Sequence, residues 1–412
     1  MSQSQSHYPE GKSFRQTLGE RYRVASIWQA VFFSAMLIAM ISLAALLYNV
    51  IDGAYGYVAY EYKKAPSTIT DIPLEDLTKQ DLLDILNDNL SSGAYKKLDN
   101  ERSMEKRPRS DLYSLFLERI IQIDTKQTWS FTESILHGTQ IKAEAAEKYP
   151  DAQLEFRSWL TPDFLSTPMS SKAEFAGVRT AVLGSLWLVG IALLFALPIG
   201  IGAAIYLQEY APQNWISRAI QTNINNLAGV PSIVYGMLGL AIFVRALEAI
   251  TSGSIFGVTD SNGRTVLSAG LTMGVLVLPL IIINAQEAIK AVPDSLRQAA
   301  YGVGATKWQT VWHHVLPNSV AGILTGSILA ISRALGESAP LIVVGASTFI
   351  SIDPSGPFSK FTALPIQIFQ WTTRAQAEFH SIAAAAIIVL LVILLSLNAT
   401  AVFLRNRFQR KY

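Results

Sequence analysis

One pair of charged residues lies inside an apolar stretch long enough to cross a membrane. Arg333 and Glu337 are four residues apart in the segment SRALGESAPL, so on a helix they share one face and can form an ion pair. A charge at the centre of a membrane helix costs about 2.5–3.5 kcal/mol on insertion scales, so such residues face a bundle interior and mark a transport path. The pair is therefore a candidate substrate contact, or else a purely structural ion pair, or one that holds this subunit to a partner subunit.

A polar segment of a different character lies between two apolar runs. Residues 297–317, RQAAYGVGATKWQTVWHHVLP, carry cationic, tryptophan and histidine side chains. Gly304 can end a first short helix because glycine accepts the left-handed conformation found at helix ends. Thr306 and Gln309 fit the capping box of a second helix, and Pro317 should stop that helix before the next apolar run.

Small and aromatic residues in this segment indicate a docking surface. Ala299 and Ala300 let a foreign surface approach the backbone closely. Trp308 and Trp312 stand one helical turn apart, where they can anchor the segment at the membrane interface. We therefore expect residues 297–317 to contact another protein.

Further candidates lie in the third apolar stretch. Arg245 is near its outer end, where an arginine either lines a path or extends to the interface. Gly229, Pro231 and Gly236 break or loosen its start. Backbone groups freed there could line a cavity, or the three residues could simply kink the helix.

The composition is that of a membrane protein. Of 412 residues, 50% are hydrophobic and 16% are charged, whereas a soluble protein carries about a quarter charged residues. A net charge of +2 is too small to indicate a nucleic-acid partner. The absence of cysteine excludes disulfides and thiolate chemistry, and the adjacent His313 and His314 point to different sides of a helix. We expect no metal site.

Six apolar stretches are long enough to span a membrane. We interpret the first as a retained anchor, not a cleaved signal, because 26 residues precede it and its apolar core is long. Gly322 and Gly326 form a GxxxG step that favours close helix packing. The predicted spans are residues 27–50, 178–206, 224–248, 266–289, 319–345 and 381–404.

The distribution of lysine and arginine predicts the orientation, because these residues are enriched in cytoplasmic loops. Residues 1–26 and 405–412 are then cytoplasmic, as is the 297–317 segment. Residues 51–177 form an extracytoplasmic domain with most of the acidic residues. Its apolar residues recur at helical spacing, so we expect a mostly helical domain that serves as a cap or docks a soluble partner.

The polar segment also resembles a known motif. Gln298-Ala299-Ala300, three residues, Gly304, nine residues and then His314-Val315-Leu316-Pro317 is similar to the EAA loop of importer-type ABC transporter permeases. Gln298 and His314 depart from that pattern. The resemblance implies that residues 290–318 form a coupling loop that inserts into a cytoplasmic ATPase. The implied ATPase contacts are Arg297, Gln298, Ala299, Ala300, Gly304, Leu316 and Pro317.

A second resemblance concerns the substrate. SRALGESAPL and GVPSIVYG, residues 229–236, look like the signature of Pst-type phosphate permeases, and specifically the PstA-like half. The resemblance covers about residues 178–404. It implies an all-α integral membrane protein with a type I permease core of five helices, preceded by the anchor and the extracytoplasmic insertion.

The resemblance also implies a function and partners. The chain would be a permease subunit of a phosphate importer in the bacterial inner membrane, and not itself an enzyme. Arg333 would bind phosphate bidentately, as lysine could not, while Glu337 holds Arg333 when the path is empty. The implied partners are a second, PstC-like permease, two copies of a PstB-like ATPase that bind ATP and Mg, a PstS-like phosphate-binding protein, inorganic phosphate and membrane lipid.

Other functions stay open at this stage. The substrate could be another oxyanion such as sulfate or molybdate. A secondary transporter would have internal repeats with broken helices, and no repeat is visible. A membrane sensor with an outer ligand domain is another alternative. The predicted cytoplasmic segments are too short for a signalling domain, which argues against a sensor. The sequence has no G-x4-GK-[ST] loop and no G-x-S-x-G or H-E-x-x-H motif, so an ATPase or a membrane enzyme is not expected.

Overall fold

The computed structural model describes residues 12–64, 68–70, 72–74, 76–101, 103–258 and 262–408. The chain divides into two compact units, at residue 52. Helix α1 (Lys12–Ala54) makes up the first, and its residues 19–54 are apolar enough to cross a membrane. At 1.5 Å per residue its 43 residues extend for about 65 Å, so the helix continues beyond the predicted span 27–50.

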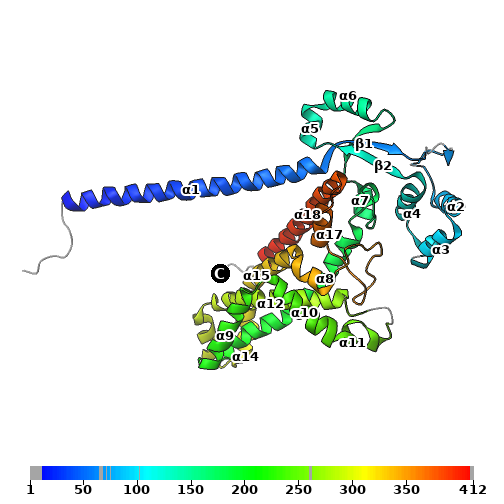
Figure 1. Ribbon diagram of the computed structural model, residues 1–412. Coiled ribbons are helices and arrows are strands. Elements are labelled where there is room, and N and C mark those ends of the chain that lie inside the picture. The colour runs from blue at the N-terminus through cyan, green and yellow to red at the C-terminus, as the bar shows by residue number, and fades with distance from the viewer. Residues whose placement is uncertain are drawn as a thin grey trace, which may run out of the picture. The chain divides into compact units, whose positions relative to one another are not determined.

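Residues 53–177 fold around a three-stranded antiparallel sheet, and we call them the outer domain. The strand order is β2-β1-β3, with Val58 of β1 opposite Thr128 of β2 and Glu155 of β3. Figure 1 shows α2, α3 and α4 grouped beyond one end of the sheet. The elements are β1 (Tyr55–Tyr62), α2 (Lys79–Asn89), α3 (Ser92–Glu101), η2 (Met104–Lys106), α4 (Arg109–Phe116), η3 (Leu117–Ile121), β2 (Ile123–Thr128), α5 (Phe131–Leu136), α6 (Gly138–Lys148), β3 (Gln153–Ser158), α7 (Pro162–Ser166) and η4 (Ala173–Phe175).

The sheet is a feature that sequence analysis missed, although the domain is mostly helical as expected. Strand β2, IDTKQT, carries one large apolar residue, and β3, QLEFRS, carries two. Their pairing with β1 joins segments about 60 to 100 residues apart along the chain. Strand stability arises from such cross-strand neighbours, which local periodicity does not reveal.

The remaining helices form the membrane bundle. Within the described residues, five helices, α1 included, are long and apolar enough to cross a membrane, or six if one bent pair counts as a span. The elements are α8 (Arg179–Ile205), η5 (Tyr206–Tyr210), α9 (Trp215–Ala228), α10 (Ser232–Gly239), η6 (Leu240–Ala246), α11 (Glu248–Thr251), η7 (Ser254–Phe256), α12 (Val266–Lys290), α13 (Asp294–Gly302), α14 (Lys307–Thr310), η8 (Val311–Val315), α15 (Leu316–Gly336), α16 (Ala339–Val344), α17 (Leu364–Thr372) and α18 (Ala377–Phe408).

Helix α12 is the most buried of the spanning helices and packs through small residues. A Cβ on Gly274 would lie 2.7 Å from the Phe195 ring of α8, and one on Gly326 would lie 2.2 Å from the Asn284 Cβ. Gly322 meets Ala288 in the same way. The predicted close packing at the GxxxG step is therefore confirmed, and it joins α15 to α12.

The third predicted span, residues 224–248, is not one straight helix. Helix α9 ends at Ala228 and α10 begins at Ser232, and the two segments meet at 103°. Gly229 caps α9 at its C-terminus, and Pro231, at φ −56° and ψ 137°, precedes α10 in an extended conformation. The bend thus falls at the glycine and proline that were expected to break the helix.

The fifth predicted span, residues 319–345, is also broken. Helix α15 ends at Gly336, Glu337 is extended with ψ 119°, and α16 begins at Ala339. Pro340 has no N–H to donate to the carbonyl of Gly336, so an uninterrupted helix would lose that hydrogen bond. The prediction of a continuous span was wrong, and the correction places Glu337 in the break.

Replacing Gly326 with alanine should destabilise the bundle, because the added methyl group must displace Asn284. Overpacking of this kind costs about 1–3 kcal/mol. Gly190 of α8 is the matched control, because a Cβ there meets nothing within 4 Å and alanine favours a helix by up to about 1 kcal/mol. Denaturant unfolding of the purified protein should show a lower free energy for Gly326→Ala only. Equal effects of the two substitutions would contradict the packing argument.

Candidate functional site

Arg333 and Glu337 lie close together at the end of α15. The Arg333 Nε and the Glu337 Oε1 are 3.6 Å apart, and the side chains are 38% and 24% exposed. The expected pairing is confirmed, although it joins a helix to the extended residue beyond it and does not run along one helical face. At 3.6 Å the contact is an ion pair and not a hydrogen bond.

The N–H groups of the Arg333 guanidinium are therefore available to donate hydrogen bonds. Within the described residues it donates no hydrogen bond, and its nearest anion is Glu337. A guanidinium presents a fixed fork of donors that fits an oxyanion bidentately. The C-terminal end of α15 adds a favourable dipole for the cation. The arrangement can exchange the Glu337 carboxylate for another anion.

The two helix breaks are held against each other. Helix α10 packs on α16, and a Cβ on Gly236 would lie 2.7 Å from the Pro340 Cα. The Tyr235 hydroxyl donates to the Leu227 carbonyl at 2.7 Å, which ties α10 back to α9. Gly236 thus serves close packing beside the segment that follows Glu337.

A hydrogen bond with α18 also holds this region, whereas Arg245 of η6 does not contact Arg333 within the described residues. The Ser332 hydroxyl donates to Asn398 Oδ1 at 2.8 Å and links α15 to α18. Arg245 is exposed on η6, and no described contact joins it to Arg333. Gly229 and Pro231 lie at the bend between α9 and α10. Whether these three contact substrate stays a prediction.

The polar segment forms two helices with a glycine between them. Gly304, at φ +82°, adopts the left-handed conformation expected after the first helix. Both hydrogen bonds of the Thr306 and Gln309 capping box are present. The Trp308 and Trp312 rings stack with centroids 5.4 Å apart. These local predictions are confirmed.

Pro317 does not stop the second helix as predicted. The helical run continues from Lys307 to Gly336 through the π-helical turn η8, in which the Leu316 N–H donates to the Val311 carbonyl. Proline lacks the N–H that an α-helix would direct to His313. A wider π-turn removes the need for that hydrogen bond, so the chain passes Pro317 without ending.

Arg297 is a positioning residue inside the fold. Its Nη2 lies 2.8 Å from Glu209 Oε1, and the two side chains are 13% and 6% exposed. The same guanidinium donates to the backbone carbonyls of Val292 at 2.6 Å and Ile289 at 3.0 Å. It therefore fixes α13 to η5, which follows α8, and to the end of α12. Sequence analysis missed Glu209, because nothing local connects residues 88 positions apart.

The polar segment of residues 297–317 has both exposed and buried side chains. Gln298 and Ala299 are exposed, whereas Ala300 is 5% exposed. Val303 is 86% exposed and Trp308 is 58% exposed. The half-buried Leu316 and Pro317 lie at the start of α15. Large apolar side chains thus stand in solvent at the tip, as a docking surface requires.

A cluster around Arg179 was also missed. The Arg179 guanidinium contacts both Asp111 oxygens, at 3.0 and 3.2 Å, and its Nε contacts Asp353 Oδ2 at 3.0 Å. Thr180 donates to Asp353 Oδ1 at 2.8 Å. Asp111 belongs to α4 of the outer domain, so this arginine joins that domain to α8 and to the segment between α16 and α17.

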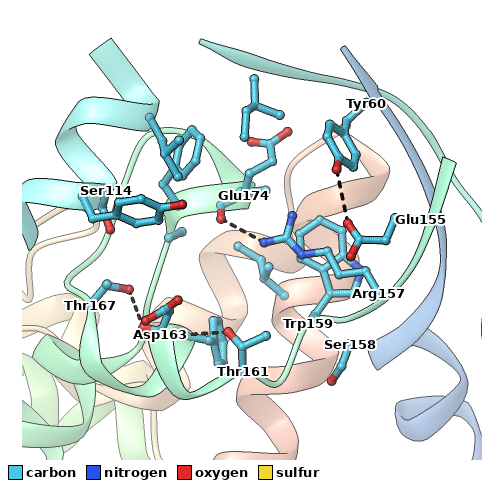
Figure 2. Close-up of a pocket in the computed structure, with 18 of the residues that line it drawn as sticks. Tyr60, Ser114, Glu155, Arg157, Ser158, Trp159, Thr161, Asp163, Thr167 and Glu174 are labelled. Atoms are coloured by element: carbon cyan, nitrogen blue, oxygen red, sulfur yellow. Dashed lines mark hydrogen bonds between the residues drawn. The ribbon is translucent and has the colours of Figure 1, made fainter. Parts of the chain in front are cut away.

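A cavity of about 540 Å³ lies beside the sheet of the outer domain. Figure 2 shows the Arg157 guanidinium between Glu155 and Glu174, and it lies 5.0 Å from the Trp159 ring centroid. The Tyr60 hydroxyl donates a hydrogen bond to Glu155 at 3.3 Å. The pKa of Tyr60 is raised, mainly by burial and to a smaller extent by a hydrogen bond with Tyr62. Carboxylates outnumber the cation here, which makes the cavity unfavourable for an oxyanion.

The side chains that could bind a metal ion do not cluster in the part of the chain that the structure describes. No group of three or more His, Asp or Glu side chains gathers there in a way that could hold a metal ion.

The apolar helices and the exposed two-helix loop define the class of this chain, a multi-pass membrane protein. Residues 196–410 match the family described as binding-protein-dependent transport system inner membrane component, and the chain belongs to that family.

Relatives of known name are similar over much of the chain. A probable ABC transporter permease, YqgI of Bacillus subtilis, is 30% identical, covering 62% of this chain and 86% of its own. The phosphate transport system permease PstA of Yersinia pestis is 34% identical, covering 56% and 74%. The corresponding PstC of Xylella fastidiosa is 33% identical, covering 52% and 69%.

Neutralising Glu209 should loosen the two-helix loop. Glu209→Gln leaves Arg297 without its buried counter-ion, and breaking a buried pair costs about 3–5 kcal/mol. Amide hydrogen exchange in residues 294–304 should then become about tenfold faster or more. Asp294→Asn is the control, because it removes the 86% exposed partner of the same arginine and should change exchange little. Similar exchange in the two variants would assign Arg297 no positioning role.

Proposed function

We propose that this chain is a permease subunit of an ATP-driven importer of inorganic phosphate. The observation that carries the proposal is the two-helix loop of residues 290–318, which keeps the EAA spacing and presents an apolar tip on a buried ionic support. The family membership supports transport. The relatives PstA and PstC, which are named for phosphate, support this substrate.

Arg333 is the proposed phosphate contact in the membrane. Its ion pair with Glu337 is long enough to leave the guanidinium fork free for an incoming anion. Phosphate would replace the Glu337 carboxylate by accepting a bidentate pair of hydrogen bonds from Arg333. The Glu337 carboxylate can then accept a hydrogen bond from a protonated phosphate oxygen. When phosphate leaves, Glu337 again neutralises Arg333 and avoids an isolated charge in the bilayer.

The proposed complex contains subunits that supply energy and substrate. Two copies of a PstB-like ATPase bind ATP and Mg, and the exposed Val303 and Trp308 contact their surface. A PstC-like permease forms the other half of the path, and a PstS-like protein delivers phosphate outside. ATP binding would draw the loops together and switch the path from outward to inward facing.

The proposed orientation places both termini and the two-helix loop in the cytoplasm of a bacterium, with the outer domain on the other side of the inner membrane. It is supported by the positive residues of the loop and by Arg405 and Arg407 at the end of α18. Such residues are enriched in cytoplasmic loops.

Arg333 should be required for phosphate uptake. In bacteria that lack their own high-affinity importer, Arg333→Gln should abolish uptake of labelled phosphate at matched membrane levels. Arg333→Lys should lower it about tenfold or more, because a hydrogen bond to a charged group contributes about 1.5–3 kcal/mol. Arg218→Gln, at an exposed arginine of α9, is the control.

The outcomes separate substrate from site. Native uptake in Arg333→Lys would refute bidentate recognition, and native uptake in Arg333→Gln would reduce Arg333 to a structural role. Competition by sulfate or molybdate at equal concentration would favour another oxyanion as the substrate.

A single cysteine at Val303 should report both orientation and docking. The chain has no natural cysteine, so Val303→Cys has no background with a membrane-impermeant maleimide. It should react in inside-out vesicles only, and co-expressed ATPase subunits should protect it. Lys142→Cys, on the exposed face of α6, should react in right-side-out vesicles only and stay unprotected. Labelling of Val303→Cys from outside would reverse the topology, and labelling unaffected by the ATPase would remove the loop from that contact.

A further inference from the structure

A large cleft separates the outer domain from the segment that leads to α17. Its volume is about 1100 Å³, and we call it the outer cleft. One wall comes from α3, α4 and η3, and the other from residues 347–360. That second wall is fixed to the start of α12, because Val266 and Leu267 donate backbone hydrogen bonds to the carbonyls of Ser359 at 3.0 Å and Pro357 at 2.8 Å.

Each carboxylate that lines the outer cleft has partners of opposite charge or hydroxyl partners. Asp111 and Asp353 both contact Arg179. Glu118 accepts hydrogen bonds from Ser170 at 2.8 Å and Ser171 at 3.2 Å. Arg179 therefore offsets part of the aspartate charge, and the Glu118 carboxylate is held inside the wall by neutral hydroxyl donors.

Among the described cations that line the outer cleft, Lys97, Arg119 and Lys360 are more exposed than its carboxylates, whereas Arg107 is buried. Lys97 and Lys360 are exposed on opposite walls, and neither forms an ion pair or a hydrogen bond within the described residues. Arg119 is 54% exposed, and its contact with Glu118 is long, at 3.7 Å. Hydroxyl groups line the space between them, from Ser114, Ser347, Ser351, Ser355 and Ser359.

The charge count confirms the difference from the cavity in Figure 2. Among the described residues, the lining of the outer cleft has four cations, Lys97, Arg107, Arg119 and Lys360, against the three carboxylates named above, a surplus of one. The cavity in Figure 2 has one cation against three carboxylates. Of these two cavities, only the outer cleft suits an anion.

The outer cleft is also connected through the chain to the site in the bundle. Its second wall begins at Ser347, three residues after the end of α16, and α16 begins two residues after Glu337. The helix break that holds the Arg333 counter-ion is therefore continuous with a basic, hydroxyl-rich surface outside the bundle.

We propose that the outer cleft is an oxyanion-binding vestibule in which Lys97, Arg119 and Lys360 collect phosphate before it reaches Arg333. The proposal rests on the proposed function for the choice of phosphate. A basic cleft with low-dielectric walls raises the local concentration of an anion about 10- to 1000-fold. The outer domain then has a role in transport, since it supplies one wall and two of the three cations.

Lysine footprinting tests the vestibule directly. The full chain, in nanodiscs with the subunits that accompany it, is acylated with and without inorganic phosphate at constant ionic strength, and each lysine is quantified by mass spectrometry. Phosphate at twice its dissociation constant should slow modification of Lys97 and Lys360 about threefold, because a third of the sites are then empty. Lys142 is the control and should not change.

The outcomes distinguish this proposal from the proposed function. If no oxyanion protects Lys97 and Lys360 while phosphate uptake is normal, the vestibule is wrong and the importer stands. If sulfate or molybdate protects them and phosphate does not, the vestibule stands and phosphate is the wrong substrate. Protection by an added receptor protein alone, independent of phosphate, would make the cleft a protein contact and overturn the vestibule.

Transport supplies a second readout. The double substitution Lys97→Gln with Lys360→Gln should lower phosphate uptake several-fold at low ionic strength and less at high ionic strength, because salt screens the attraction. Lys142→Gln should have no effect. A loss of uptake that is the same at both ionic strengths would contradict electrostatic collection.

Discussion

The close approach of α12 to its neighbours is the constraint on which the bundle depends. Helices in lipid gain little from hydrophobic burial against one another, so they associate through tight packing. Gly274 allows α12 to touch α8, and Gly326 allows α15 to touch α12. The position of α15 determines where Arg333 lies. The candidate site is thus set by glycines that have no chemistry of their own.

The same constraint explains why the irregular backbone occurs where it does. Lipid offers no hydrogen bonds, so a broken helix is tolerated only where protein or water surrounds it. The break after Gly336 meets α10 through the contact of Gly236 with Pro340, and α10 itself follows the bend at Gly229 and Pro231. Two helix breaks that are far apart in the sequence therefore pack against each other and shield their backbone from lipid. They place Glu337 beside Arg333, in the region where a polar substrate is expected.

Local patterns predicted the local features of this protein. Apolar length located α8, α12 and α18, and the capping box of Thr306 and Gln309 located the second loop helix. The four-residue spacing of Arg333 and Glu337 predicted their pairing, while their contact with substrate stays a prediction. Features that depend on distant residues were not predictable. The support of Arg297 by Glu209, the pairing of β1 with β2 and β3, and the π-turn that carries the helix past Pro317 all depend on tertiary contacts.

The sign of charge in the outer domain shows the same limit. The sequence places most acidic residues in residues 51–177, which by composition alone favours an acidic surface. The fold instead binds Asp111 and Asp353 to one arginine and Glu118 to two serine hydroxyls, and leaves Lys97 and Lys360 exposed on the cleft walls. Local potential follows from which charges are compensated, not from how many are present. An acidic domain can therefore still present an exposed cation such as Lys97 to an anion, and Arg179 contributes because it pairs with two carboxylates while joining the domain to the bundle.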